Sequence, residues 1–139
     1  MWSAATVLVC ALELLGRGAG SFPPIVLLDV RPPDVSARAE AFIRHGDPAI
    51  YVMTSSPTFV RARQALHRCG DREALVKLAS ILVHEESHVR QGTTESEAYA
   101  AQLVTLIGLD AGPGSMLYTE VSRSRREVVA QGKRLRASR

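Results

Sequence analysis

Aromatic side chains are scarce in this sequence, at 5% of its 139 residues. Aliphatic residues must therefore fill most of the core, because few large rings are available to bury. The scarcity also bears on nucleic acid, since proteins that bind single strands stack the bases on aromatic side chains. The basic C-terminal segment, residues 123–139, contains no aromatic residue. We therefore expect no nucleic-acid partner.

Cysteine is also rare. Cys10 and Cys69 are too few for the disulfide framework of a small secreted domain, and neither has the spacing of a zinc ligand. Cys69 is expected to be a plain thiol near a helix end.

Long apolar runs are missing as well. Ala4 to Leu15 is too short to cross a bilayer, which takes about 20 residues, so no stable membrane span is expected. The run has the length of a signal-peptide core, and the small residues 19–21 could follow it as a cleavage region. However, no Lys or Arg precedes it, and Glu13 interrupts it. Residues 1–20 are therefore either a weak export signal or an N-terminal helix, with the folded domain over 21–139 in the cytoplasm or exported.

Acidic residues are nearly absent from the C-terminal end. There, Glu127 alone stands against Arg123, Arg125, Arg126, Lys133, Arg134, Arg136 and Arg139. A basic segment of this kind can touch nucleic acid or an anionic membrane, but it is more often a solvated helix face.

The stretch that carries chemistry is His84-Glu85-x-x-His88, a HExxH motif. An apolar lead-in at helical spacing precedes it, Asp71 can cap the helix and Gly92 can end it. Residues four apart on a helix lie one above the other, so both imidazoles can reach one Zn²⁺. Glu85 is rotated by about 100° from His84, beside the metal, where a general base belongs.

A catalytic zinc usually has a third protein ligand. Thr94 is expected to cap a second helix, and Thr94-x-x-Glu97 has the form of a capping box. If Glu97 is engaged in that cap, Glu95 is the freer carboxylate and the preferred ligand, and Glu97 is the alternative. Gly92 permits the sharp reversal that would bring this helix start over His88.

His84-Glu85-x-x-His88 followed by Glu95-x-x-Ala98 resembles the gluzincin group of zinc metallopeptidases, over residues 78–106. The resemblance implies that His84, His88 and Glu95 bind zinc and that Glu85 is the catalytic base. It also implies a minimal zincin domain, in which a short sheet packs on the active-site helix.

The sequence departs from the family pattern at three points. The gap between His88 and Glu95 is very short, Glu86 is charged where the family usually has an uncharged residue, and Tyr99 stands where several members have an Asp that supports a ligand histidine.

A simpler interpretation is a solvated helix face. Glu85 and Glu86 would then pair with cations such as Arg90, and Glu95 would only stabilise the start of its helix. Chance does not account for the apolar lead-in, the terminating glycine and a second helix that begins with carboxylates.

The rest of the chain predicts an α+β fold. We expect strands over residues 25–30 and 49–54, and helices over residues 34–43, 57–68, 71–91, 95–109 and 116–136. The helix over 95–109 is apolar on nearly all faces and is therefore expected to be buried. By the resemblance, the domain is zincin-like, with a ligand helix and a C-terminal helix after the active-site helix.

The expected function is zinc-dependent hydrolysis of a peptide or protein substrate, with Glu85 as general base. The strand Ile50 to Thr54 is expected to lie at the sheet edge and pair with the substrate. Tyr99 and Gln102 share the face of Glu95 and could orient the ligands. The donor to the oxyanion is left open among Tyr99, Tyr118, Tyr51 and His45.

Two other classes of function compete with this one. The domain could bind zinc and serve as a catalytically inactive structural or regulatory module. Alternatively, a basic helical protein could bind nucleic acid through its Arg-rich end and leave the motif unused.

Overall fold

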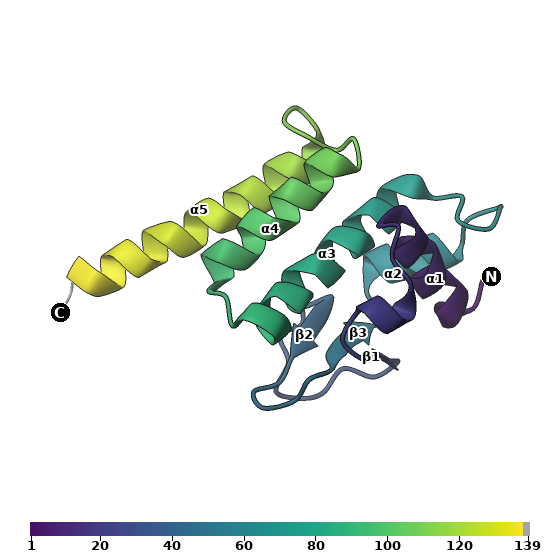
Figure 1. Cartoon of the computed structure of the whole chain (residues 1–139), viewed down its shortest axis with the longest axis horizontal. Coiled ribbons are helices and arrows are strands. Elements are labelled where there is room, and N and C mark those ends of the chain that lie inside the picture. The colour runs from purple at the N-terminus through teal and green to yellow at the C-terminus, as the bar shows by residue number, and fades with distance from the viewer. Residues whose placement is uncertain (138–139) are drawn as a thin grey trace.

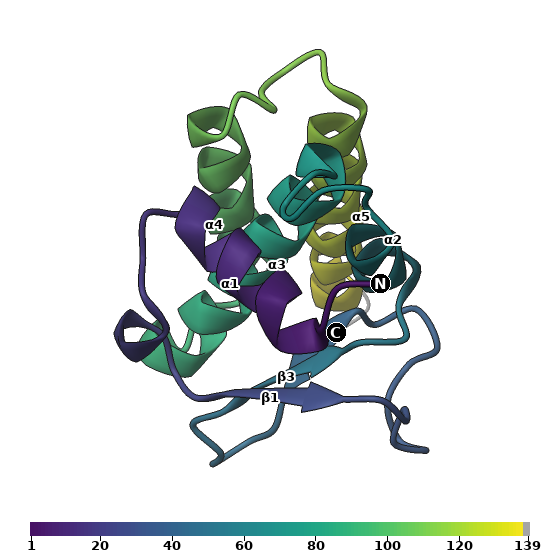
Figure 2. The ribbon, with the colours of Figure 1, turned by 90° about the vertical axis from the view of Figure 1, so that its right-hand side faces the viewer.

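In the computed structural model, which describes residues 1–137, five α-helices lie to one side of a small sheet (Figures 1 and 2). The elements in chain order are α1 (Ala4–Leu14), a 3-10 turn η1 (Ala19–Ser21), β1 (Ile25–Leu28), β2 (Ala41–Ile43), β3 (Ile50–Met53), α2 (Pro57–Arg63), α3 (Arg72–Gln91), α4 (Glu95–Gly108) and α5 (Met116–Ala137). This confirms the predicted α+β class, both predicted strands and the last three predicted helices. Arg139, part of the basic C-terminal end, lies outside the described residues.

The sheet has the strand order β1-β3-β2, with β1 parallel and β2 antiparallel to β3 (Figure 2). The predicted helix over 34–43 is therefore wrong, because residues 41–43 form β2 instead. Pairing with β3 overrides the local helical preference: Phe42 lies opposite Tyr51 and the two rings stack at 5.1 Å. The prediction of an edge strand over 50–54 is also wrong, since β3 is the central strand.

Helix α3 is the centre of the molecule. The sheet, α1, α2 and α4 pack against it, and α5 packs against α4 (Figure 1). Its apolar face carries Leu75, Leu78, Ala79 and Leu82, all nearly inaccessible to solvent, into the main core cluster. Phe59 of α2 is the largest fully buried side chain of that core, which is otherwise mostly aliphatic.

The N-terminal segment is part of this core. In α1, Val7, Cys10 and Leu12 are buried, and Cys10 forms a disulfide with Cys69, which precedes α3. The expectation that Cys69 is a plain thiol is therefore wrong. The two cysteines are 59 residues apart, and their approach depends on the packing of α1, which spacing alone does not reveal. The core thus includes residues that precede residue 21. Export of the chain stays a prediction.

Two predicted helices differ in detail. The helix expected over 57–68 ends at Arg63, whose carbonyl accepts a hydrogen bond from the Trp2 backbone. Helix α4 is not buried all round, since Val104 is 69% and Ile107 51% exposed. Its two neighbours, α3 and α5, leave the remaining face to solvent. Within residues 1–137, no helix is both long and apolar enough to cross a membrane.

Candidate metal centre

The HExxH motif lies in the last two turns of α3. The helix begins where the Asp71 side chain accepts a hydrogen bond from the Ala74 backbone N–H, and it ends at Gly92, whose φ of 60° is left-handed. The Gly92 N–H donates to the carbonyl of His88. These boundaries, both predicted from the sequence, place His84 and His88 one turn apart on one face.

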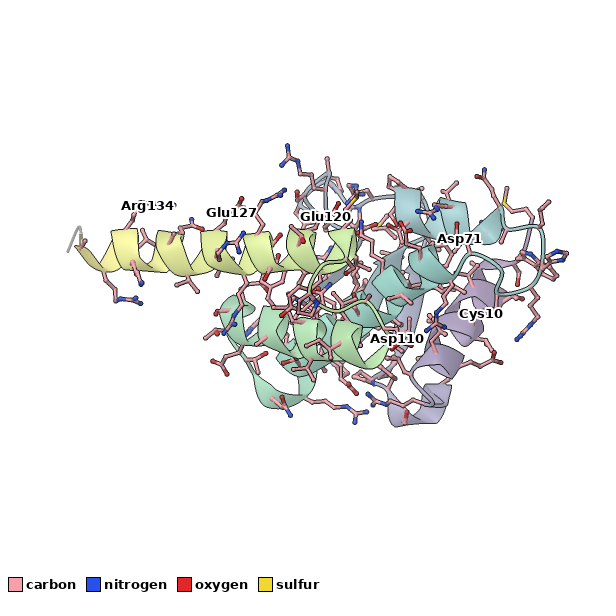
Figure 3. All side chains as sticks on the ribbon, turned by 90° about the horizontal axis from the view of Figure 1, so that it is seen from above. Cys10, Asp71, Asp110, Glu120, Glu127 and Arg134 are labelled. Carbon is pink, nitrogen blue, oxygen red and sulfur yellow. A yellow bond between two sulfur atoms is a disulfide. The ribbon has the colours of Figure 1, made fainter. Side chains whose placement is uncertain are left out.

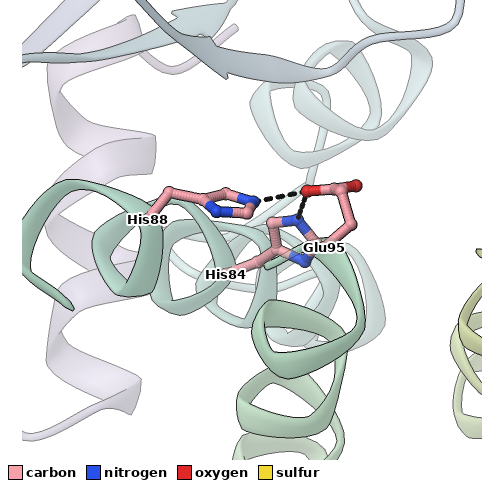
Figure 4. Close-up of side chains that lie close together, drawn as sticks. All are labelled: His84, His88 and Glu95. Atoms are coloured by element: carbon pink, nitrogen blue, oxygen red, sulfur yellow. Dashed lines mark hydrogen bonds and ion pairs between the residues drawn. The ribbon is translucent and has the colours of Figure 1, made fainter. Parts of the chain in front are cut away.

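Helix α4 returns directly over that face. Thr94 caps it, with the Thr94 Oγ1 accepting from the Glu97 N–H and donating to a Glu97 carboxylate oxygen at 3.0 Å. Glu97 is thereby engaged in the cap, and Glu95 is left to reach the histidines. Its Oε1 lies 3.0 Å from the His84 Nε2 and also contacts the His88 Nε2 (Figure 4). One ligand atom from each of the three residues lies within 4.8 Å of the other two.

The protonation of His84 follows from its hydrogen bonds. Ser80 has one hydroxyl hydrogen, which it donates to the Lys77 carbonyl, so Ser80 accepts from the Gln102 amide nitrogen. The Gln102 oxygen therefore faces the His84 Nδ1, at 2.9 Å, and that nitrogen must donate. In the neutral imidazole, the Nε2 then carries a lone pair directed at Glu95.

His88 is held in the same way. Its Nδ1 lies 2.9 Å from the carbonyl oxygen of Thr93, which can only accept. The neutral His88 ring thus also turns an Nε2 lone pair toward Glu95. Two lone pairs and a carboxylate converge with no hydrogen between them, an arrangement that requires a cation or a shared proton.

The group fits a metal ion in donor type and in spacing. Ligand atoms around a tetrahedral ion with bonds of 2.0–2.1 Å are roughly 3.3 Å apart, close to the 3.0 Å between His84 and Glu95. Three protein ligands also leave a fourth position open. His84, His88 and Glu95 can therefore hold a metal ion.

The carboxylates of the site differ in electrostatics. When His84 is protonated in the metal-free site, its Nε2–H donates a hydrogen bond to Glu95, which lowers the pKa of Glu95 to about 2 and keeps this carboxylate ionised. Burial lowers the pKa of His84, but the hydrogen bond to Glu95 and the charges of Glu85 and Glu95 outweigh it, and the pKa is raised. Burial raises the pKa of Glu85, which brings this carboxyl closer to the range of a general base.

A cleft of about 490 Å³ opens beside these residues. Its lining includes His84, Glu85 and Glu95, residues 38–41 around the start of β2, and one side of α5. Tyr99, one turn after Glu95, also lines it, and its ring meets that of His84 edge-on at 4.6 Å. A second cavity of about 540 Å³, at the N-terminal end of α3, contains none of the three ligand residues.

The other three candidate donors lie elsewhere. Tyr51 bonds to Asp47 beyond the sheet, Tyr118 packs in the apolar cluster between α4 and α5, and His45 is exposed in a turn. None of these three lines the cleft. Tyr99 is thus the candidate that the fold brings to the metal group.

The sequence analysis did not predict several contacts of the site. The Thr93 carbonyl carries no residue-type signal, and the Ser80 hydroxyl could not be matched to Gln102 without the helix crossing. Glu86, whose charge departs from the family pattern, does not line the cleft and accepts hydrogen bonds from the two terminal guanidinium nitrogens of Arg17. A charged residue at that position therefore anchors the segment after α1.

No protein-family model matches this chain, and neither a curated protein nor a solved structure is significantly similar to it.

Proposed function

We propose that this protein is a zinc metallopeptidase in which His84, His88 and Glu95 bind the zinc ion. The observation that carries the proposal is the convergence of two imidazole lone pairs and one carboxylate beside an open cleft that also contains Glu85. Two histidines and a glutamate are a donor set that zinc uses in hydrolases. When bound, zinc supplies Lewis acidity, which acidifies water and polarises a peptide carbonyl.

Glu85 is the proton carrier of the proposed reaction. It adjoins His84 in sequence and lines the cleft rather than pairing with a cation. The Glu85 carboxylate takes a proton from the attacking water and passes it to the nitrogen of the leaving amine as the C–N bond breaks. Its raised pKa suits both halves of that transfer.

Tyr99 is proposed as the donor to the carbonyl oxygen as that oxygen gains negative charge. Burial and the nearby charge of Glu95 raise the pKa of the phenol, so it keeps its proton at neutral pH. Ser124 of α5, which also lines the cleft, interacts with the phenol and partly offsets this rise of the pKa.

The substrate is proposed to bind as an extended strand along β2. β2 pairs with β3 alone and is an edge strand, and residues 38–41 border the cleft. An extended peptide can add to such an edge through main-chain hydrogen bonds. This replaces β3, the strand expected from the sequence, in that role.

The test compares two neighbouring substitutions. The zinc-loaded chain is assayed for cleavage of an unfolded protein substrate, with and without a chelator, as wild type, Glu85→Gln and Glu86→Gln. We expect Glu85→Gln to lose at least about 100-fold in rate and to keep its zinc. Glu86→Gln makes the same chemical change outside the cleft and is expected to stay active.

Zinc-loaded wild type that cleaves no faster than Glu85→Gln would contradict the proposal. The chain would then be a zinc-binding structural or regulatory module, in which His84→Ala lowers the melting temperature and Glu85→Gln does not.

A further inference from the structure

Helix α5 has two halves with different surroundings. Leu117, Glu120, Val121 and Ser124 of its first half line the cleft. From Arg125 on, the helix runs past the first residues of α4 and projects from the body of the protein (Figures 1 and 3). We call residues 125–137 the arm.

The arm is exposed and strongly basic. Its only acidic residue is Glu127, and its cations are Arg125, Arg126, Lys133, Arg134 and Arg136, all exposed. Within residues 1–137, none of the five forms an ion pair, whereas Arg17, Arg44, Arg61, Arg68 and Arg90 all pair with carboxylates. Arg31, Arg38, Arg63, Arg72 and Arg123 also form no ion pair, so half of the ten unpaired cations in residues 1–137 lie on the arm.

This charge costs the arm stability when it is alone. Arg134 and Arg136 interact favourably with the negative end of the helix dipole. However, Lys133 and Arg136 repel each other three residues apart, and a projecting helix of this length is marginal in water. A polyanion along the arm would offset that repulsion.

We propose that the arm binds an acidic segment of the same polypeptide that occupies the cleft. This inference rests on the proposed peptidase function for the identity of the occupant. Four of the five arm cations are arginines, whose planar guanidinium groups grip a carboxylate with two hydrogen bonds.

The position of the arm selects a polypeptide as the occupant. α5 is one unbroken helix, so the arm continues the line of the cleft wall formed by its first half. The arm is roughly 17 Å long from residue 125 to 136, at 1.5 Å per residue, which spans about five residues of extended chain. At 100° per residue, the cations of the arm lie on the face of α5 away from the residues that line the cleft. A substrate that leaves the cleft therefore reaches them by passing around the helix, with about five residues along the arm.

Other polyanions fit less well. Insertion into a membrane surface requires one broad apolar face, and the arm lacks aromatic residues and exposes Val129 among cations. The Cys10–Cys69 disulfide is typical of oxidising compartments, which counts against a nucleic acid.

The experiment measures binding without turnover. The zinc-loaded Glu85→Gln chain is titrated into two fluorescent peptides that share a neutral segment and end in about five Glu or five Gln residues. The Glu run is placed at either end in separate peptides. The arm variant carries Arg126→Gln, Lys133→Gln and Arg134→Gln. The control variant loses the same charge elsewhere, through Arg44→Gln, Arg61→Gln and Arg68→Gln.

We expect one of the Glu peptides to bind the arm variant at least about tenfold more weakly than the control variant, and higher salt to remove the difference. The Gln peptide should not distinguish the two. Equal affinity of both variants for the Glu peptides would overturn the proposal. Tighter, arm-dependent binding of anionic vesicles or duplex DNA would overturn the choice of occupant.

The two proposals can fail separately. A wild-type chain that cleaves nothing, while the arm still selects the Glu peptide, contradicts the peptidase and leaves the polyanion-binding arm. A chain that cleaves protein but shows no arm effect contradicts the arm alone.

Discussion

Gln102 is expected to control metal affinity without touching the metal. Its amide oxygen accepts the Nδ1–H of His84, and its amide nitrogen is fixed by Ser80. The substitution Gln102→Leu keeps a side chain of similar size in a position that is 5% exposed but removes the acceptor. The His84 Nδ1–H then has no partner in a site where His84 itself is 6% exposed.

The size of the effect follows from that loss. An unsatisfied buried donor costs about 1–3 kcal/mol, and loss of a partner that orients a ligand typically lowers metal affinity by 10–100-fold. A change of 10–100-fold corresponds to about 1.4–2.8 kcal/mol, so the two estimates agree. Gln102→Leu is therefore expected to raise the Kd for Zn²⁺ by about 10–100-fold.

The assay is competition for Zn²⁺ against a chromophoric chelator, with Gln102→Glu as the matched control. A glutamate keeps an oxygen acceptor for His84, so its Kd should stay within about threefold of wild type. Circular dichroism checks that both variants are folded. Unchanged zinc affinity in folded Gln102→Leu would refute the hydrogen-bond argument for the His84 tautomer.

Three further predictions concern stability, measured by urea unfolding. Replacing Cys10 and Cys69 by serine should cost up to about 4 kcal/mol, because the disulfide closes a long loop, with a sequence separation of 59; no loss relative to the oxidised wild type would contradict this. Leu82→Ala, at a position with 0% exposure, should cost about 2–5 kcal/mol, and a loss below 1 would show a loosely packed core. In the metal-free chain, the lowered pKa of Glu95 stabilises the fold fully above 4.5, its ordinary value, and the gain disappears as the pH falls toward 2. The raised pKa of His84 acts below 6.5 and is lost at higher pH. Glu95→Gln should therefore destabilise most between pH 4.5 and 6.5, by roughly 1 kcal/mol after solvent screening of a half-exposed carboxylate, and a pH-independent difference would contradict the pairing.

The sequence predicted those elements whose signals are local. Asp71, Gly92 and Thr94 set helix boundaries through side-chain caps and a left-handed glycine, so α3 and the start of α4 could be located to the residue. By contrast, β2 is a three-residue strand that exists because β3 is beside it. Its sequence alone favours a helix, and the resulting error also assigned the sheet edge to the wrong strand.

In the candidate site, too, only the features with a local sequence signal could be predicted. Two histidines four residues apart and a capping box that engages Glu97 made Glu95 the preferred third ligand, with Glu97 left as the alternative. The hydrogen-bond partners of the two histidines could not be predicted from the sequence. The partner of His88 is the backbone carbonyl of Thr93, and the partner of His84, Gln102, depends on how α4 crosses α3. The Cys10–Cys69 disulfide likewise depends on the packing of α1, for which two isolated cysteines give no signal.

The central claim is that His84, His88 and Glu95 form one metal site, and metal content per chain tests it most directly. Zinc is added to purified wild type, His88→Ala, Glu95→Ala and Glu97→Ala, free metal is removed, and the bound zinc is counted by mass spectrometry. The account predicts about one zinc per chain in wild type and Glu97→Ala, and a large loss in His88→Ala and Glu95→Ala. Wild type that retains no more zinc than His88→Ala, or a loss in Glu97→Ala in place of Glu95→Ala, would contradict it.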